Sequence, residues 1–269
     1  MDSRKLERIL ILILALLNVF LLAVVISDSV QTRRSAAETA ARLTELLGRS
    51  GIEASEDAVR LRQAPQPCTL TRDLTAEQRL ITRLVGENRP TELGGNIVTY
   101  AGARGQAQLR GSGETDILLE TGAVPVRGGM TRTAQRLLRS AGIRTLPVGE
   151  ASEERQELTL CATLDGCPVY NALFTVEFAG DSIYMITGTR LFDTVSRSDG
   201  APVLDSVTVL IRFLELVREG GYICSRIDAV ESGYLQTVVR SGETELAPVW
   251  RIVTDAGAFL IDAATGEPV

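Results

Sequence analysis

The stretch ILILILALLNVFLLAVVI, Ile9–Ile26, lies near the start of the sequence, and Asn18 is its only polar residue. No other part of the chain is so uniformly apolar. As a helix, these 18 residues rise about 27 Å at ~1.5 Å per residue, close to the ~30 Å hydrocarbon core of a bilayer. We therefore expect a transmembrane anchor within residues 1–29, followed by a region that folds in water.

Two other interpretations of this stretch are weaker. A cleaved signal peptide has a shorter apolar core of about 7–15 residues and a small-residue cleavage site, which 27–30 does not supply. A helix of a soluble core is rarely apolar on every side, whereas lipid favours such a helix. An uncleaved signal anchor is the expectation.

The charges that flank the stretch indicate its orientation. Arg4, Lys5 and Arg8 precede it closely, whereas Arg33 and Arg34 lie further out on the other side. The positive-inside rule then places the N-terminus in the cytoplasm, and the bulk of the chain outside the cell membrane.

Asn18 is a polar group at mid-membrane depth. It is either a tolerated amide bonded to its own helix or a donor to a partner helix, a bond worth about 0.6–2 kcal/mol. We take Asn18, together with Ala15 and Leu22, as the candidate partner contacts in the span.

Composition excludes several functions. The net charge is −6, and no basic run is interleaved with aromatic residues, which argues against nucleic acid as a partner. The chain has no histidine, and its only lysine, Lys5, precedes the span. Ser-His and Cys-His pairs, His-bearing zinc sites and a Ser-Lys dyad are therefore excluded. Carboxylates, tyrosine, arginine and cysteine remain as groups that could carry chemistry, and we expect no cofactor and no metal site.

The four cysteines are Cys68, Cys161, Cys167 and Cys224, and none forms a C-x-x-C motif. Asp165-Gly166 is a hairpin signal, which would place Leu164 opposite Cys167, and Cys161 opposite Tyr170. Cys161 and Cys167 would then point to opposite faces of the sheet and could not bridge. Reduced, packed thiols are expected.

Capping signals and apolar stripes predict helices at 35–47, 75–85, 131–140 and 205–218. The third is the weakest. The second begins with the capping box Thr75–Gln78, and the fourth carries its stripe on Val207, Leu210, Ile211, Leu214 and Val217. Predicted strands lie at 96–100, 106–110, 116–120, 158–164, 168–178, 182–188, 222–230, 234–240, 248–254 and 258–262.

The second half of the chain contains a repeat of a helix followed by strands. Pro168–Asn171 corresponds to Pro248–Arg251, each at the start of the longer arm of a hairpin. Two unrelated segments sharing a dipeptide are the alternative. We favour a duplication, with an N-terminal α+β lobe at 30–130 and repeated units at 131–200 and 201–269. Tyr170 and Trp250 are then core or rim aromatics.

Two motifs resemble known families. Val249–Val253 followed by Ala258–Glu267, ending in Asp-Ala-Ala-Thr-Gly-Glu, is similar to the last hairpin of PepSY-like domains. The start, with Arg4-Lys5 leading into Leu17–Leu22, resembles the YycI family of single-span regulatory proteins of Gram-positive bacteria. The resemblance implies an α+β fold, with helices packed on antiparallel sheets in duplicated PepSY-like units outside the membrane.

For function, the resemblance implies a regulator without catalytic residues. Its partners would be the membrane histidine kinase WalK (YycG) and a YycH-like protein, in a system that governs cell-wall metabolism. The alternatives are an anchored envelope binding or assembly module, a PepSY-like protease inhibitor, and a carboxylate-based glycosidase. For the last, Glu177 and Asp181 near a hairpin are the candidates, although solvated turn carboxylates are the simpler interpretation.

Overall fold

A computed structural model describes residues 38–152, 154–198, 200–220 and 223–269. The predicted span, with Ala15, Asn18 and Leu22, lies outside these residues. Within them, no helix has the length and apolarity needed to cross a membrane. The described chain is α+β, as expected, with four helices and a mixed sheet.

The helices are the segment 38–49, α2 (Leu74–Val85), α3 (Met130–Ser140) and α4 (Ser206–Gly220). The strands are β1 (Glu53–Ala54), β2 (Cys68–Thr71), β3 (Asn88–Gly94), β4 (Ile97–Gly102), β5 (Gly105–Leu109), β6 (Glu114–Leu119), β7 (Thr145–Pro147), β8 (Glu157–Leu164), β9 (Cys167–Ala179), β10 (Ser182–Thr189), β11 (Thr194–Arg197), β12 (Arg226–Arg240), β13 (Glu243–Thr254) and β14 (Gly257–Asp262).

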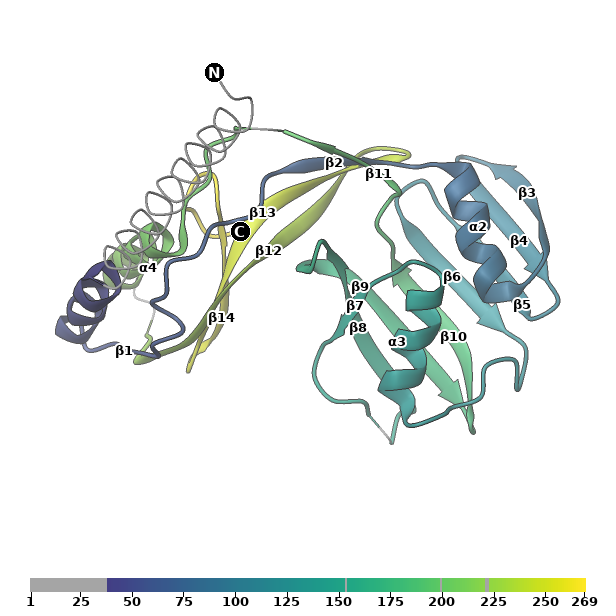
Figure 1. The fold of residues 1–269 in the computed structure, drawn as a ribbon, viewed down its shortest axis with the longest axis horizontal. Helices are drawn as coiled ribbons and strands as arrows, with labels where there is room; N and C mark the ends of the chain where they lie inside the picture. Colours follow the sequence, from purple (N-terminus) through teal and green to yellow (C-terminus); the bar gives the residue numbers. More distant parts are fainter. Residues whose placement is uncertain (1–37, 153, 199, 221–222) are drawn as a thin grey trace, which may run out of the picture.

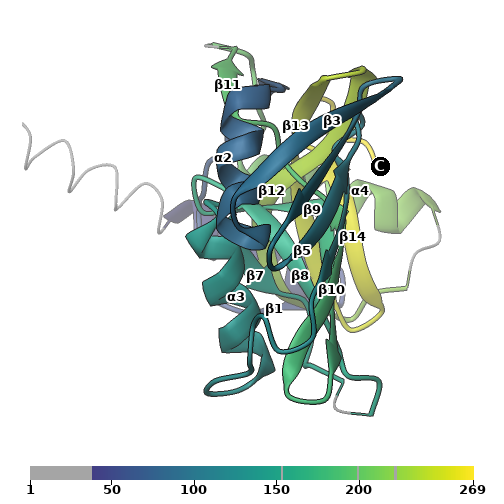
Figure 2. The same cartoon turned by 90° about the vertical axis from the view of Figure 1, so that its right-hand side faces the viewer.

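Two hydrophobic cores divide these elements into two lobes joined by β12 and β13 (Figure 1). The α2–α3 lobe contains α2, α3 and an antiparallel sheet in the order β7-β8-β9-β10-β6-β5-β4-β3. Figure 2 shows α2 and α3 on one face of this sheet. The period-2 alternation of the strands supplies that apolar face; on β5, Ala107 and Leu109 are buried and Gln106 is exposed.

The start of α2 differs from the predicted capping box. Asp73 is the N-cap, and its side chain accepts hydrogen bonds from the backbone N–H groups of Thr75 (2.8 Å) and Ala76 (3.3 Å). Glu77 points into the core, because two arginines and a tyrosine hold its carboxylate there. The helix ends at Val85, and Gly86 follows as the expected stop, with a φ of 89° that glycine adopts readily.

In the α4 lobe, α4 and the segment 38–49 share one core with the sheet of β12, β13 and β14. Trp250 is fully buried there and donates from Nε1 to the Leu204 carbonyl at 2.9 Å, so the expectation of a core aromatic is confirmed. The predicted stripe of α4 is wrong at Ile211, which is 40% exposed, whereas Val209 and Phe213 are buried. The buried arc is rotated because the sheet and the segment 38–49 contact α4 together.

The long ribbon differs from the predicted strands in two respects. The strands expected at 222–230 and 234–240 form one strand, β12. β13 begins at Glu243, so Pro248 lies in mid-strand and does not begin an arm. A proline is tolerated there because it falls between the two partners on that edge of β13: β2 pairs with 243–246, and β14 with 249–254.

The sheet is not purely antiparallel, because β12 has two parallel partners. β1 pairs with its beginning, and β9 pairs with it at one position, Val169 opposite Tyr234. β9 therefore belongs to both lobes, and the two parallel pairings correct the expectation of purely antiparallel sheets.

The β8–β9 hairpin forms at Asp165-Gly166, with φ of 51° and 86°, and Leu164 faces Cys167 as predicted. Cys161, however, faces Leu173 and not Tyr170. A bulge shifts the register where β9 leaves β8 to join β12. All four cysteines are free thiols.

Candidate functional site: a groove beside a buried arginine–glutamate cluster

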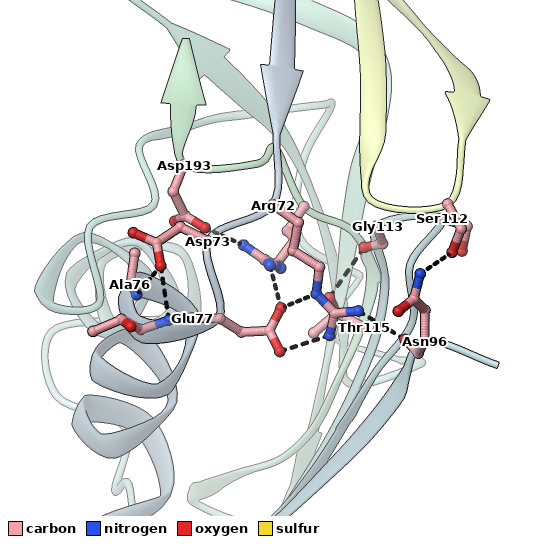
Figure 3. Close-up of polar contacts among 12 residues, drawn as sticks. Arg72, Asp73, Ala76, Glu77, Asn96, Ser112, Gly113, Thr115 and Asp193 are labelled. Atoms are coloured by element: carbon pink, nitrogen blue, oxygen red, sulfur yellow. Dashed lines mark hydrogen bonds and ion pairs between the residues drawn. The ribbon is translucent and has the colours of Figure 1, made fainter. Parts of the chain in front are cut away.

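A charged cluster is buried where α2 meets the sheet. Glu77 is fully buried, and its Oε1 accepts from Arg72 Nη2 at 2.7 Å and from the Tyr100 hydroxyl at 2.6 Å. Its Oε2 accepts from Arg72 Nε at 2.7 Å and from Arg190 Nη2 (Figure 3). We call Glu77, Arg72, Tyr100 and Arg190 the Glu77 cluster.

The cluster keeps Glu77 ionised. Burial by itself would raise the pKa of Glu77, but the hydrogen bond from Arg72, the charge of Arg190 and the Tyr100 hydroxyl outweigh it and hold the pKa below its usual range. Burial and the bond to Glu77 raise the pKa of Tyr100. Each oxygen of the Glu77 carboxylate already has two donors, so this carboxylate has no acceptor site left for a ligand and its role is structural.

The cluster fastens α2 to two other segments. Arg72 Nη1 donates to the Asn96 carbonyl at 2.7 Å, in the turn between β3 and β4. Arg190 Nη1 donates to Asp193 Oδ2 at 3.2 Å, and its guanidinium lies 5.2 Å from the centre of the Phe192 ring. Because buried charges are costly unless paired, these bonds define one position for α2 and for the segment 190–193.

Next to this cluster lies a groove of about 350 Å³, which we call the α2 groove. Its walls come from α2, the turn after α3, the end of β8 and the segment 191–195. Its lining includes a set of apolar side chains, which we call the floor: Leu80, Ile143, Ala162, Leu164, Leu191, Phe192 and Val195. Since Phe192 and Asp193 also contact Arg190, the Glu77 cluster supports one wall of the groove.

Three arginines line the α2 groove: Arg79 and Arg83 on α2, and Arg144 after α3. Arg83 Nη1 donates to the Ser140 carbonyl at 2.9 Å, which ties α2 to the end of α3, and Arg79 Nε donates to the Thr75 carbonyl at 3.3 Å. Within the part of the chain that the structure describes, none of the three forms an ion pair with a carboxylate. The acidic lining residue, Asp193, is already paired with Arg190.

The residues singled out in the sequence lie elsewhere. Ala15, Asn18 and Leu22 are outside the described residues. Glu177 is half-buried on β9, and Asp181 is exposed in the β9–β10 turn. Over the described ranges, no group of three or more His, Cys, Asp or Glu side chains is arranged to hold a metal ion.

The α2 groove is not apparent from the sequence. Arg79 and Arg83 are four residues apart on α2, a spacing that is typical of a solvated helix face. Arg144 lies in a turn far along the chain. Only the packing of α2 beside the end of α3 brings the three together.

Comparison with known proteins gives weak structural neighbours. No family model matches the chain, and no curated protein matches it. An uncharacterized protein from Eubacterium rectale aligns with a TM-score of 0.47 and 10% identity, over 81% of this chain and 89% of that one. YycH from Bacillus subtilis aligns with a TM-score of 0.37 and 13% identity, over 77% of this chain. The alignment spans about half of YycH, 53% of its chain.

Proposed function

We propose that this chain is a membrane-anchored, non-enzymatic regulator of a two-component histidine kinase that controls cell-wall metabolism. In this proposal, residues 9–26 cross the cell membrane with the N-terminus in the cytoplasm, and the two lobes lie outside. The WalK (YycG)-like kinase and a YycH-like protein are its partners, and the units at 131–200 and 201–269 are PepSY-like. The span and the terminal hairpin motif support this proposal from the sequence.

The structural observation that carries the proposal is the continuity of β12 and β13 through both lobes. At one end of the ribbon, Ile227, Trp250 and Ile252 are buried in the core of the α4 lobe. Further along, Tyr234 and Leu246 are buried in the core of the α2–α3 lobe. Both strands are therefore fixed at two places, so the lobes are joined by a paired ribbon and not by a flexible linker.

A rigid connection suits a regulator that has one span. Such a protein changes its partner only by binding two states of that partner with different affinities. A ribbon that holds the lobes in one arrangement would let a contact on the α2–α3 lobe bias the position of the α4 lobe. The segment 38–49 of the α4 lobe follows the predicted span after a short polar link.

The test is crosslinking in native membranes followed by purification. The intact chain is compared with a version whose residues 9–26 are replaced by an unrelated transmembrane helix. Recovery of a histidine kinase with the native span, and its loss with the replacement, supports the proposal. If neither version recovers a kinase, the anchor is a tether, and an envelope binding or assembly module or a protease inhibitor replaces the regulator.

A second arm addresses the ribbon. Asn171→Ala removes two hydrogen bonds between β9 and β12 and leaves the span intact. We expect this variant to recover the kinase as well as the native chain does, but to change kinase autophosphorylation less. Equal effects of both chains on autophosphorylation would contradict a mechanical role for the ribbon.

A further inference from the structure

The α2 groove combines features that point to a ligand. Its three guanidinium groups carry positive charge in a chain whose net charge is −6, and no carboxylate of the described residues pairs with them. Guanidinium groups bind carboxylates and phosphates through paired N–H donors. The site therefore suits an anionic ligand.

The apolar floor of the groove indicates which class of anionic ligand fits the site. Among the apolar lining residues, Leu80 and Phe192 are buried, Ile143, Leu164 and Leu191 are half-buried, and Val195 is 36% exposed. A polymer of phosphate groups would leave this apolar surface without a partner. A peptide that alternates carboxylates with apolar side chains would cover it and would also reach the arginines.

The groove is also preorganised. Arg83 is bonded to the last turn of α3, and the Glu77 cluster fixes α2 and the segment 190–193. Binding a ligand therefore requires little additional ordering of the backbone around the groove, so little conformational entropy is lost. At about 350 Å³, the groove is at the small end of the roughly 300–1,000 Å³ of ligand clefts, which fits a short segment and not a folded domain.

We propose that the α2 groove binds a short acidic peptide segment of a partner protein. Apolar side chains of the peptide rest on the floor, and its carboxylates pair with Arg79, Arg83 and Arg144. The proposal stands apart from the kinase assignment, because its assay contains no kinase.

The test uses the full chain in detergent micelles and the fluorescently labelled peptide Glu-Leu-Glu-Leu-Glu, followed by fluorescence anisotropy. The groove variant is Arg79→Glu with Arg83→Glu. The matched control is Arg42→Glu with Arg89→Glu, at two exposed positions outside the groove. Each pair changes the net charge from −6 to −10, since each substitution adds −2.

We expect the groove variant to weaken binding roughly tenfold or more, about 1.4 kcal/mol, and the control to leave it within about twofold. Added salt should weaken binding to the native chain, because the arginines are exposed. The peptide Gln-Leu-Gln-Leu-Gln, which lacks the carboxylates, should bind poorly. Far-ultraviolet circular dichroism checks that each variant is folded, and Arg144→Gln provides a milder second variant.

Four outcomes would overturn the proposal. The acidic peptide fails to bind the native chain, or the glutamine peptide binds as well. The groove variant and the control weaken binding equally, which indicates a net-charge effect. Inorganic polyphosphate binds in a way that depends on Arg79 and Arg83 while the peptide does not, which makes the occupant a phosphate polymer.

Discussion

The side chain of Asn171 on β9 pairs with the backbone of Gln236 on β12 as a neighbouring strand would. Its Nδ2 donates to the Gln236 carbonyl, and its Oδ1 accepts from the Gln236 N–H, both at 2.8 Å. These bonds continue the parallel contact between Val169 and Tyr234. One amide side chain thus helps to join the two lobes.

Asn171→Ala should lower the free energy of unfolding by about 1–2 kcal/mol, because a backbone N–H and a carbonyl both lose their partner. Urea denaturation followed by circular dichroism measures the change. Asn171→Asp keeps the acceptor but places a carboxylate oxygen against the Gln236 carbonyl oxygen, so its free energy of unfolding should also be lower than that of the native chain. An alanine variant as stable as the native chain would show that water replaces both bonds at no cost.

Gly233 lies where β12 passes close to the beginning of β9. A Cβ at this position would lie 2.6 Å from the Pro168 carbonyl oxygen and 2.6 Å from Cε2 of Tyr170. Gly233→Ala should therefore destabilise the chain by about 1–3 kcal/mol or more, since backbone atoms cannot yield as a flexible side chain does.

Gly48→Ala is the matched control for this substitution. A Cβ at Gly48 meets no atom within 4 Å, and the residue lies in the helical segment 38–49. Alanine there should leave the unfolding free energy unchanged or raise it by up to about 1 kcal/mol. Equal losses for both variants would contradict the close approach at Gly233.

Glu77→Gln should lower the free energy of unfolding by about 3–5 kcal/mol near neutral pH, because it leaves Arg72 and Arg190 buried without a counter-charge. Glu92→Gln, on exposed β3, is the control and should be nearly neutral. Urea denaturation of the three proteins gives the comparison. A loss as small for Glu77→Gln as for Glu92→Gln would mean that solvent reaches the cluster.

The difference in stability between the native chain and Glu77→Gln should also depend on pH, in a direction that the pKa of Glu77 determines. Folding lowers the pKa of Glu77 from the 4.5 of a free carboxyl, so its contribution is complete above that pH and is lost as the pH falls toward the folded value. The difference in unfolding free energy between the native chain and Glu77→Gln should therefore be constant above pH 4.5 and should decrease below that pH. A gap that widens in acid would contradict an ionised Glu77.

The cysteines should react with a thiol reagent in two classes. Cys68 and Cys161 are buried, with exposed fractions of 1% and 4%, whereas Cys167 and Cys224 are half-buried. Burial raises the pKa of all four thiols, so labelling should be slow near neutral pH and accelerate as the pH rises. Single Cys→Ser variants assign the classes, and one common rate for all four would contradict the packing.

Local signals predicted much of the fold. The helices α2, α3 and α4, the meander of β4, β5 and β6, and the hairpin at Asp165-Gly166 all appear where capping residues, alternation and turn residues indicate them. These features depend on neighbours within a few residues of each other. The errors at Pro248 and Cys161 arise where a distant strand decides the pairing.

The α2 groove could not be predicted from the sequence for the same reason. Arg79 and Arg83 look like a solvated helix face, and Arg144 like a turn residue. Nothing in their spacing shows that Arg83 meets the end of α3, or that Arg190 crosses to Glu77.

The sequence by itself determined the types of element, the alternation that buries one face of each strand, and the lack of histidine chemistry, because these depend on residue type and local spacing. Only the tertiary structure decided that β9 joins β12, that Glu77 turns inward, and that three arginines share one groove. Those arrangements depend on contacts between segments far apart in the chain, where packing and charge pairing outweigh local preference.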